Sequence, residues 1–199
     1  LQALVELLKY DTSVILVLAG DGILKEEIEN SVKNLCLSEY VLLPGFITSQ
    51  DKVNYLRMAD LYVLPSIEAE DGDREGLPVS LLESMSYGKV CIATRESGAE
   101  EVLITGENGF LCAAGNSGLL LEKIRMVMSL NNHDRQKIEA NAVADETIPP
   151  EKREIGPTIT GMIHKKTTSS KNNILIEEMA IPGPLKTFFE ESVTTLNTL

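Results

Sequence analysis

Short apolar runs and amphipathic stretches alternate along the first two thirds of the chain. The run Val14–Ala19 is wholly apolar and rich in β-branched residues, which is typical of a strand buried on both faces of a parallel sheet. The turn Gly20-Asp21-Gly22 ends this run, and a charged pattern with helical spacing follows from Leu24 to about Leu35. The same cycle of strand, glycine turn and helix then repeats.

The alternation predicts a Rossmann-like parallel sheet with helices on both faces, because strictly alternating elements require right-handed crossovers. Ser49 is the expected N-cap of the third helix. The predicted strands are Val14–Ala19, Tyr40–Pro44, Leu61–Pro65, Val90–Ala93 and Gly109–Cys112. The predicted helices are Leu1–Lys9, Leu24–Leu35, Ser49–Met58, Pro78–Tyr87, Ala99–Leu103 and Ser117–Leu130.

The character of the sequence changes after residue 143. Ile148-Pro149-Pro150 and Ile181-Pro182-Gly183-Pro184 break any helix, and a polar run separates them. We therefore expect one domain over residues 1–143 and an irregular or weakly ordered tail over residues 144–199. The chain starts inside a helical leucine pattern without an initiator methionine, so we expect the domain to be truncated at its N-terminus.

Composition narrows the possible functions. The chain is 43% hydrophobic with a formal net charge of -12, which argues against nucleic acid as a partner. A small diphosphate remains a suitable ligand, because the free N–H groups at a helix start supply local positive potential. Cys36, Cys91 and Cys112 are far apart in apolar settings, which favours small core residues in a reducing compartment and hence a cytoplasmic protein.

The loop after the third predicted strand carries the densest chemistry. Ligands of parallel sheets bind beyond the carboxyl ends of the strands, and this loop joins such an end to a helix. Gly76 and Pro78 favour a helix start with free N–H groups. Glu75 and Glu83 are eight residues apart, about two helical turns, and a carboxylate accepts hydrogen bonds from vicinal hydroxyls. A partly buried glutamate satisfied by the backbone is the structural alternative for Glu83.

The segment from Glu75 to Met85 resembles the E-x7-E motif of retaining family-4 (group 1) glycosyltransferases of GT-B architecture. Further motifs stand in the family's order and spacing, and the loop Glu70–Gly76 is similar to bacterial exopolysaccharide glycosyltransferases. The resemblance covers roughly residues 1–130. The supporting motifs are Ala19-Gly20-Asp21-Gly22, Leu43-Pro44-Gly45-Phe46, Ala59–Ser66 and Glu107-Asn108-Gly109-Phe110-Leu111.

The resemblance implies a donor site for a nucleoside-diphosphate sugar, with UDP and GDP both possible as the nucleotide. It gives Glu83 the nucleotide ribose and places Glu75, the catalytic candidate, near the donor sugar. The N–H groups of Gly76 and Leu77 face the sugar and the distal phosphate. Gly45 and Phe46 lie where the family places the base, and Gly20 borders the same cleft; a core phenylalanine and a plain turn are the respective structural alternatives.

The resemblance also implies what this sequence lacks. In the family, an arginine and a lysine neutralise the donor diphosphate as it leaves, and this basic pair lies upstream of the first predicted helix. The N-terminal acceptor domain is absent as well. We therefore expect the chain alone to be inactive. The full-length protein is compatible with peripheral membrane association. No cofactor or metal is expected: the Asp71-Gly72-Asp73 sequence fits a solvated acidic loop better than a manganese site, and His133 and His164 receive no role.

Other classes of protein remain as alternatives. A non-catalytic module that binds a nucleotide sugar or a protein partner fits the missing basic pair. A nucleotide-sugar epimerase would require a histidine in a strand-end loop, which the sequence lacks. A signalling receiver domain would require an aspartate at the end of a central strand, where Pro65-Ser66 stands instead.

Overall fold

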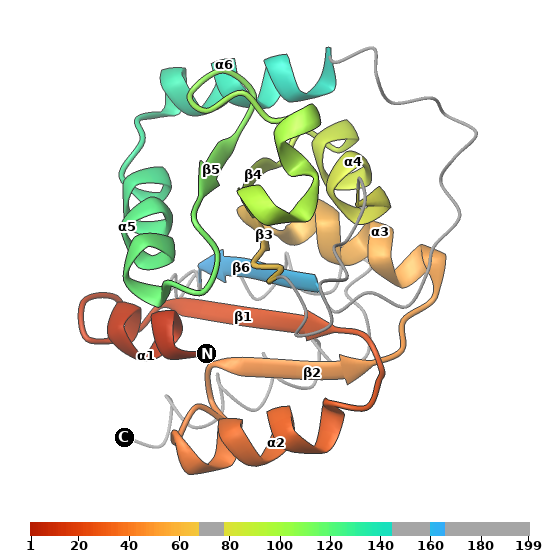
Figure 1. Cartoon of the computed structure of the whole chain (residues 1–199), viewed down its shortest axis with the longest axis vertical. Coiled ribbons are helices and arrows are strands. Elements are labelled where there is room, and N and C mark those ends of the chain that lie inside the picture. Colours follow the sequence, from red (N-terminus) through yellow and green to blue (C-terminus); the bar gives the residue numbers. More distant parts are fainter. Residues whose placement is uncertain (68–77, 145–159, 166–199) are drawn as a thin grey trace, which may run out of the picture.

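The computed structural model describes residues 1–67, 78–144 and 160–165. These residues form a six-stranded sheet between two layers of helices (Figure 1). The strands are β1 Val14–Ala19, β2 Val41–Gly45, β3 Leu61–Leu64, β4 Val90–Thr94, β5 Phe110–Cys112 and β6 Thr160–Lys165. The α-helices are α1 Gln2–Leu8, α2 Lys25–Asn34, α3 Ser49–Met58, α4 Val79–Ser86, α5 Ser117–Met128 and α6 Asn132–Val143.

The doubly wound core of the sheet confirms the expected fold class. The strand order is β2-β1-β6-β3-β4-β5, and the pairs β1–β2, β3–β4 and β4–β5 are parallel. The chain therefore winds outward in one direction through α2 to β2 and in the other direction through α4 to β4. The point where the direction reverses lies between β1 and β3.

One strand departs from the expected all-parallel sheet. β6 lies at the point of reversal and pairs antiparallel with both neighbours, along six positions of β1 and three of β3. It belongs to the segment 144–199, and no regular element was expected at residues 160–165. In the remainder of that segment the sequence also allows a short strand at Ile174–Met179 and a short helix at Leu185–Val193. Both lie outside the described residues.

Alternating side chains of the strands fill two hydrophobic cores. In β1, Val14 and Leu16 pack on one face, and Ile15 and Val17 pack on the other. This two-residue period is what a strand between two helical layers requires. The first face is covered by α1, α2 and α5, and the second by α3 and α4 (Figure 1).

The ends of several helices differ from the sequence predictions. The N-cap of α3 is Thr48 and not Ser49: the Thr48 hydroxyl accepts from the Asp51 N–H, and the Asp51 carboxylate accepts from Thr48. This reciprocal capping box satisfies two free donors of the first turn. Pro78 is the N-cap of α4 and lies just outside its first turn.

Two helical segments after β4 differ more strongly. The predicted helix Ala99–Leu103 is a pair of 3₁₀ turns, Arg95–Ser97 and Ala99–Glu101, joined by Gly98 in the left-handed region. Helix α6 was not predicted. It begins at an Asn131 side chain that accepts from the Asp134 N–H, and it buries Ile138 and Ala142.

Candidate functional site

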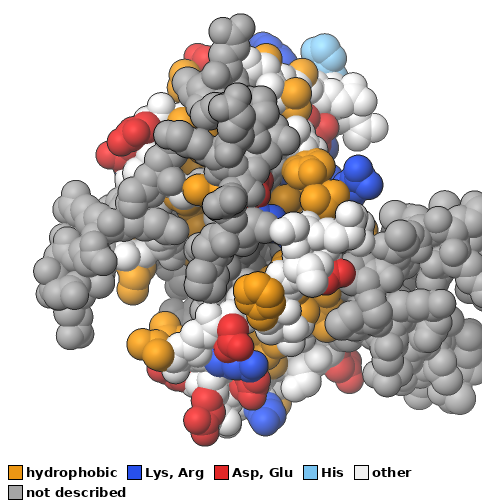
Figure 2. All heavy atoms as spheres, turned by 90° about the vertical axis from the view of Figure 1, so that its right-hand side faces the viewer, with side chains coloured by type: hydrophobic (Ala, Val, Ile, Leu, Met, Phe, Trp, Pro, Cys, Tyr) orange, Lys and Arg blue, Asp and Glu red, His pale blue; other side chains and the backbone are white. Residues whose placement is uncertain are grey.

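The carboxyl ends of β1, β2 and β3 open onto one face of the molecule. Ligands of doubly wound sheets bind beyond such ends, at the point where the strand order reverses. Figure 2 shows this face, where apolar side chains stand among charged ones. Ile23, Phe46 and Ile67 lie in the loops after β1, β2 and β3, and their exposed fractions are 100%, 69% and 67%.

Gly20 and Gly45 bring the first two of these loops together. The N–H of Gly20 donates to the carbonyl of Gly45 over 2.8 Å. Gly20 has a φ of 147° and Gly45 a φ of 70°; the Gly45 value lies in the left-handed region that side chains with a Cβ disfavour. The two predicted donor-site glycines are therefore adjacent, and each has a conformation that glycine adopts readily.

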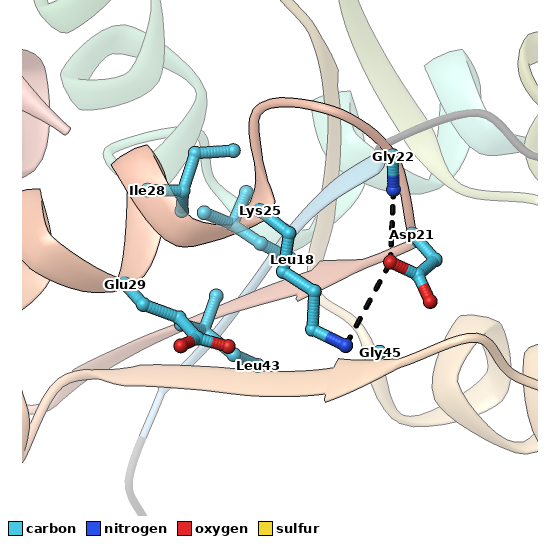
Figure 3. Close-up of a pocket in the computed structure, with 9 residues that line it drawn as sticks. Leu18, Asp21, Gly22, Lys25, Ile28, Glu29, Leu43 and Gly45 are labelled. Carbon is cyan, nitrogen blue, oxygen red and sulfur yellow. Dashed lines mark hydrogen bonds and ion pairs between the residues drawn. The ribbon is translucent and has the colours of Figure 1, made fainter.

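A small hollow lies beside these glycines, under the start of α2 (Figure 3). Leu18, Ile28 and Leu43 form its apolar wall, while Asp21 and Lys25 lie at its polar rim. Its free volume for solvent is about 20 Å³, which is room for about one water molecule. A nucleobase does not fit inside, so a base at this position would have to lie across the mouth.

Lys25 supplies positive charge at this rim. Its ammonium lies 3.7 Å from the Asp21 carboxylate, and it would be 3.8 Å from a Cβ added at Gly45. Both partners of the ion pair are about half exposed, so the pair adds little to stability. Lys25 is not among the predicted site residues, because a lysine at the start of a charged helix is a common surface residue.

Phe46 follows Gly45 and is a surface residue. Its exposed fraction of 69% excludes the core phenylalanine that the sequence left as an alternative. A large exposed aromatic side chain beside a glycine turn offers a flat apolar surface at the carboxyl edge of the sheet. Such a surface is suitable for stacking against a planar ring.

Glu83 is a buried carboxylate on α4, with an exposed fraction of 6%. Its Oε2 atom accepts a hydrogen bond of 2.5 Å from the Lys52 ammonium of α3. A buried charge is costly unless it is paired, and Lys52 provides that pairing. The structural alternative, a glutamate satisfied by the backbone, is therefore wrong: a side chain 31 residues away satisfies it.

The first turn of α4 lies close in sequence to Glu83. The Pro78 carbonyl accepts from the N–H groups of Leu81 and Leu82. The Ser80 hydroxyl oxygen is buried and has no hydrogen-bond partner among the described residues. A buried hydroxyl in this state carries a desolvation cost, and it marks the start of α4 as a place with unused hydrogen-bonding capacity.

Three predicted site residues belong to the loop between β3 and α4. Glu75, Gly76 and Leu77 lie outside the described residues, as does the acidic sequence Asp71-Gly72-Asp73. Of the predicted donor-site residues, Gly20, Gly45, Phe46 and Glu83 are described: the first three lie together after β1 and β2, and Glu83 lies on the helix that follows β3.

Lys52 is the principal residue that sequence reasoning missed. A single lysine near the start of a helix carries no local signal, and its partner is on another helix. Its only sequence-level indication is indirect: Lys52 lies in the helix that follows the Gly45 loop, at the edge where ligands of such sheets bind.

One motif that carried the resemblance has a structural role. The Asn108 amide donates to the Val102 carbonyl over 2.8 Å and accepts from the Ile104 N–H over 2.7 Å. A Cβ added at Gly109 would lie 2.9 Å from the Cys91 carbonyl oxygen, so a larger residue does not fit there. These contacts fix the path of the loop that leads into β5.

The cysteines and the other titratable groups bear on the site only indirectly. Cys91 and Cys112 are buried, as predicted, but Cys36 is exposed and so is not a core residue. Burial raises the pKa of the Cys91 thiol well above its ordinary value.

Within the part of the chain that the structure describes, no three His, Cys, Asp or Glu side chains lie together in a group that could bind a metal ion. In that part, no helix is long and apolar enough to cross a bilayer.

The strand order and the loop cluster define a doubly wound α/β domain whose ligand edge lies at the carboxyl ends of its strands. Residues 1–144 match the family model described as glycosyl transferases group 1, and the chain belongs to this family. The expected fold class, the Rossmann-like half of a GT-B glycosyltransferase, is confirmed.

The curated relatives include exopolysaccharide glycosyltransferases. The chain is 34% identical over 101 residues to the amylovoran biosynthesis glycosyltransferase AmsK of Erwinia amylovora, which is 51% of this chain and 25% of that protein. It is 39% identical over 103 residues to the N-acetyl-alpha-D-glucosaminyl L-malate synthase of Bacillus anthracis, again 51% and 25%. The chain thus spans about a quarter to a third of the length of its curated relatives.

Solved structures show the same fold. Anabaena HepE in complex with UDP-glucose superposes with a TM-score of 0.61 and 26% identity, over 72% of this chain and 39% of that chain. The C-terminal domain of the group 1 glycosyltransferase LpcC of Francisella tularensis gives 0.50 and 29%, over 60% of this chain and 58% of that domain.

Proposed function

We propose that this chain is the donor-binding domain of a retaining glycosyltransferase that transfers a hexosyl group from a nucleoside-diphosphate sugar to a glycan or lipid acceptor. The observation that carries the proposal is Glu83: a buried, ion-paired carboxylate on the helix that follows β3. A carboxylate in that place is suited to accept hydrogen bonds from the two hydroxyls of a ribose.

The other described groups have complementary roles in this proposal. Gly20 and Gly45 let the backbone approach the nucleotide closely, and Phe46 stacks on the base. The free N–H groups at the start of α4 face the diphosphate, as helix starts do in other phosphate sites. Glu75, Gly76 and Leu77 are assigned to the sugar and the distal phosphate by resemblance alone.

One solved relative supports a nucleotide sugar as donor. HepE has been crystallised with UDP-glucose and with UDP and glucose, and this chain shares its fold at 26% identity. The chain spans 39% of the length of HepE. By resemblance to the family, the proposal assigns the acceptor to an N-terminal domain. Transfer then requires both parts, and the described domain by itself binds donor without turnover.

Calorimetric titration of this chain with UDP, GDP and their sugar conjugates tests the proposal. Without the family's basic pair we expect a dissociation constant on the order of 0.1–1 mM, or about 4–5.5 kcal/mol. Glu83→Gln keeps an oxygen that accepts from Lys52 but removes the charge, and we expect it to weaken binding at least tenfold. Glu122→Gln is the matched control, because Glu122 is exposed on α5.

The second candidate is a non-catalytic module derived from such an enzyme. It is favoured if no nucleotide binds at millimolar concentration while thermal unfolding of the chain remains cooperative. Binding of one nucleotide that Glu122→Gln preserves and Glu83→Gln weakens supports the donor site and identifies the base.

A further inference from the structure

The ion pair between Lys52 and Glu83 joins two helices at the ligand edge of the sheet. Lys52 is on α3, Glu83 is on α4, and the exposed fractions of their side chains are 14% and 8%. The two positions are 31 residues apart in sequence. The pair is therefore a tertiary contact that forms only when both helices are packed on the sheet.

The pairing uses only part of the carboxylate. Lys52 binds Oε2, and among the described residues no hydrogen bond is made to Oε1. A carboxylate has two oxygens and about four acceptor positions. The Lys52 contact therefore fixes the direction of the carboxylate while leaving acceptor capacity for a ligand.

Local structure fixes Lys52 in turn. The capping box of Thr48 and Asp51 sets the first turn of α3, and Tyr55, one turn later, is only 2% exposed. A cation near a helix start opposes the helix dipole, so helix stability does not explain a lysine at this position. Its packing and its partner do.

We propose that Lys52 is a positioning residue for the donor: it holds Oε2 of Glu83 so that the remaining acceptor capacity of the carboxylate faces the ribose hydroxyls. This inference rests on the proposed function, because it assigns the ribose to Glu83. The lysine ammonium acts as a point charge that binds one carboxylate oxygen, so it is suited to this positioning role. An arginine would be less suited, since its planar fork matches both oxygens of a carboxylate at once.

The ratio of affinities for a nucleotide and its 2′-deoxy analogue measures this role. UDP and 2′-deoxy-UDP are titrated into the full chain, or GDP and 2′-deoxy-GDP if guanosine is the base that binds. Loss of a hydrogen bond to a charged group lowers affinity about tenfold or more, so we expect the wild-type chain to prefer the ribonucleotide by about that factor.

Two substitutions separate positioning from charge compensation. Lys52→Met removes the ammonium, and we expect the preference to fall to about onefold to threefold. Lys52→Arg keeps the charge and so keeps Glu83 paired and the domain folded, but its fork competes for both oxygens, and we expect the preference to fall as well. Lys33→Met, at an exposed position near the end of α2, is the matched control and keeps the wild-type preference.

The outcomes separate this inference from the proposal on which it depends. If wild type prefers the ribonucleotide and Lys52→Arg keeps that preference, Lys52 only compensates charge and its positioning role is wrong, while the donor site stands. If wild type binds no nucleotide, the donor site and the inference fail together. Should Lys52→Met not fold, the comparison of Lys52→Arg with wild type still decides.

Discussion

The hydroxyl of Thr94 donates a hydrogen bond of 2.6 Å to the main-chain carbonyl of Ser66. Thr94 is 3% exposed at the end of β4, and Ser66 begins the loop after β3. The contact ties the start of this loop to the neighbouring strand. Glu75, a predicted site residue, follows later in the sequence of the same loop.

Thr94→Val tests this contact, because valine has the shape of threonine without its hydroxyl. We expect a loss of about 1 kcal/mol in the free energy of unfolding, measured by urea denaturation. If the proposed donor site is right, nucleotide binding weakens as well. Thr94→Ser keeps the hydroxyl and separates the hydrogen bond from the lost methyl group; equal stability of the valine variant and wild type would contradict the expectation.

Tyr55→Phe should not destabilise the protein. Tyr55 is 2% exposed and its hydroxyl has no hydrogen-bond partner in the part of the chain that the structure describes, so removing it relieves a desolvation cost of about 1 kcal/mol. Tyr87→Phe, at a more exposed position, is the control for the chemical change alone. A clear destabilisation by Tyr55→Phe would show that the hydroxyl has a partner in solution.

The same substitution changes stability at high pH. Burial, with a smaller contribution from the Asp51 carboxylate, raises the pKa of Tyr55 to about 12. The folded state thus favours the neutral phenol, and this contribution is fully present below pH 10 and lost as the pH rises from 10 to about 12. As the pH rises over this range, the unfolding free energy of wild type should therefore fall relative to that of Tyr55→Phe. A difference independent of pH would contradict the sign.

Cys36→Gly should stabilise the domain. Cys36 has a φ of 54° and follows α2 in a Schellman motif, in which Leu37 N–H donates to Val32 and Cys36 N–H to Lys33. A residue with a Cβ is strained in this left-handed position, so glycine should gain up to about 1 kcal/mol despite its greater chain entropy. Cys36→Ala keeps the Cβ and should show no such gain in thermal denaturation.

Removing residues 145–199 should disrupt the sheet. This truncation deletes β6, which pairs with β1 and β3, and leaves two apolar strands with open edges. We expect loss of cooperative unfolding or association of the chain, measured by denaturation and size-exclusion chromatography. A chain ending after Lys165 keeps β6 and is the matched control; a monomeric, cooperative 1–144 fragment would show that β6 is dispensable.

Chelation tests the expectation that the donor needs no metal. We expect the dissociation constant of the nucleotide to be the same with EDTA as with Mg²⁺ or Mn²⁺, because helix N–H groups supply the proposed phosphate contacts. Asp71→Asn combined with Asp73→Asn tests the alternative metal motif directly. Binding that EDTA and the double variant both abolish would assign a metal to that loop.

Elements with a strong local pattern were predictable from the sequence. The strand Val14–Ala19 and the helix Ser49–Met58 have the predicted bounds, because an apolar run and an amphipathic period report burial directly. The N-cap of α3 was misplaced by one residue, since Thr48 and Ser49 are both good caps and only the reciprocal bond with Asp51 distinguishes them.

Features that depend on distant partners were not predictable. β6 carries a glycine and a histidine within its six residues and gains its place from pairing with β1 and β3. The Lys52–Glu83 pair likewise depends on how two helices meet. At Glu83 the sequence indicated the chemistry, but the partner that compensates its charge became known only from the packing.

The place of β6 in the sheet also sets the order in which a growing chain can complete its fold. Ile15 pairs with His164 across about 150 residues, so the centre of the sheet stays open until β6 has left the ribosome. Closing so long a loop is slow, and the edges of β1 and β3 are exposed to other chains in the meantime. A sheet completed by so late a strand therefore exposes its apolar strand edges for longer than one completed from the N-terminal end.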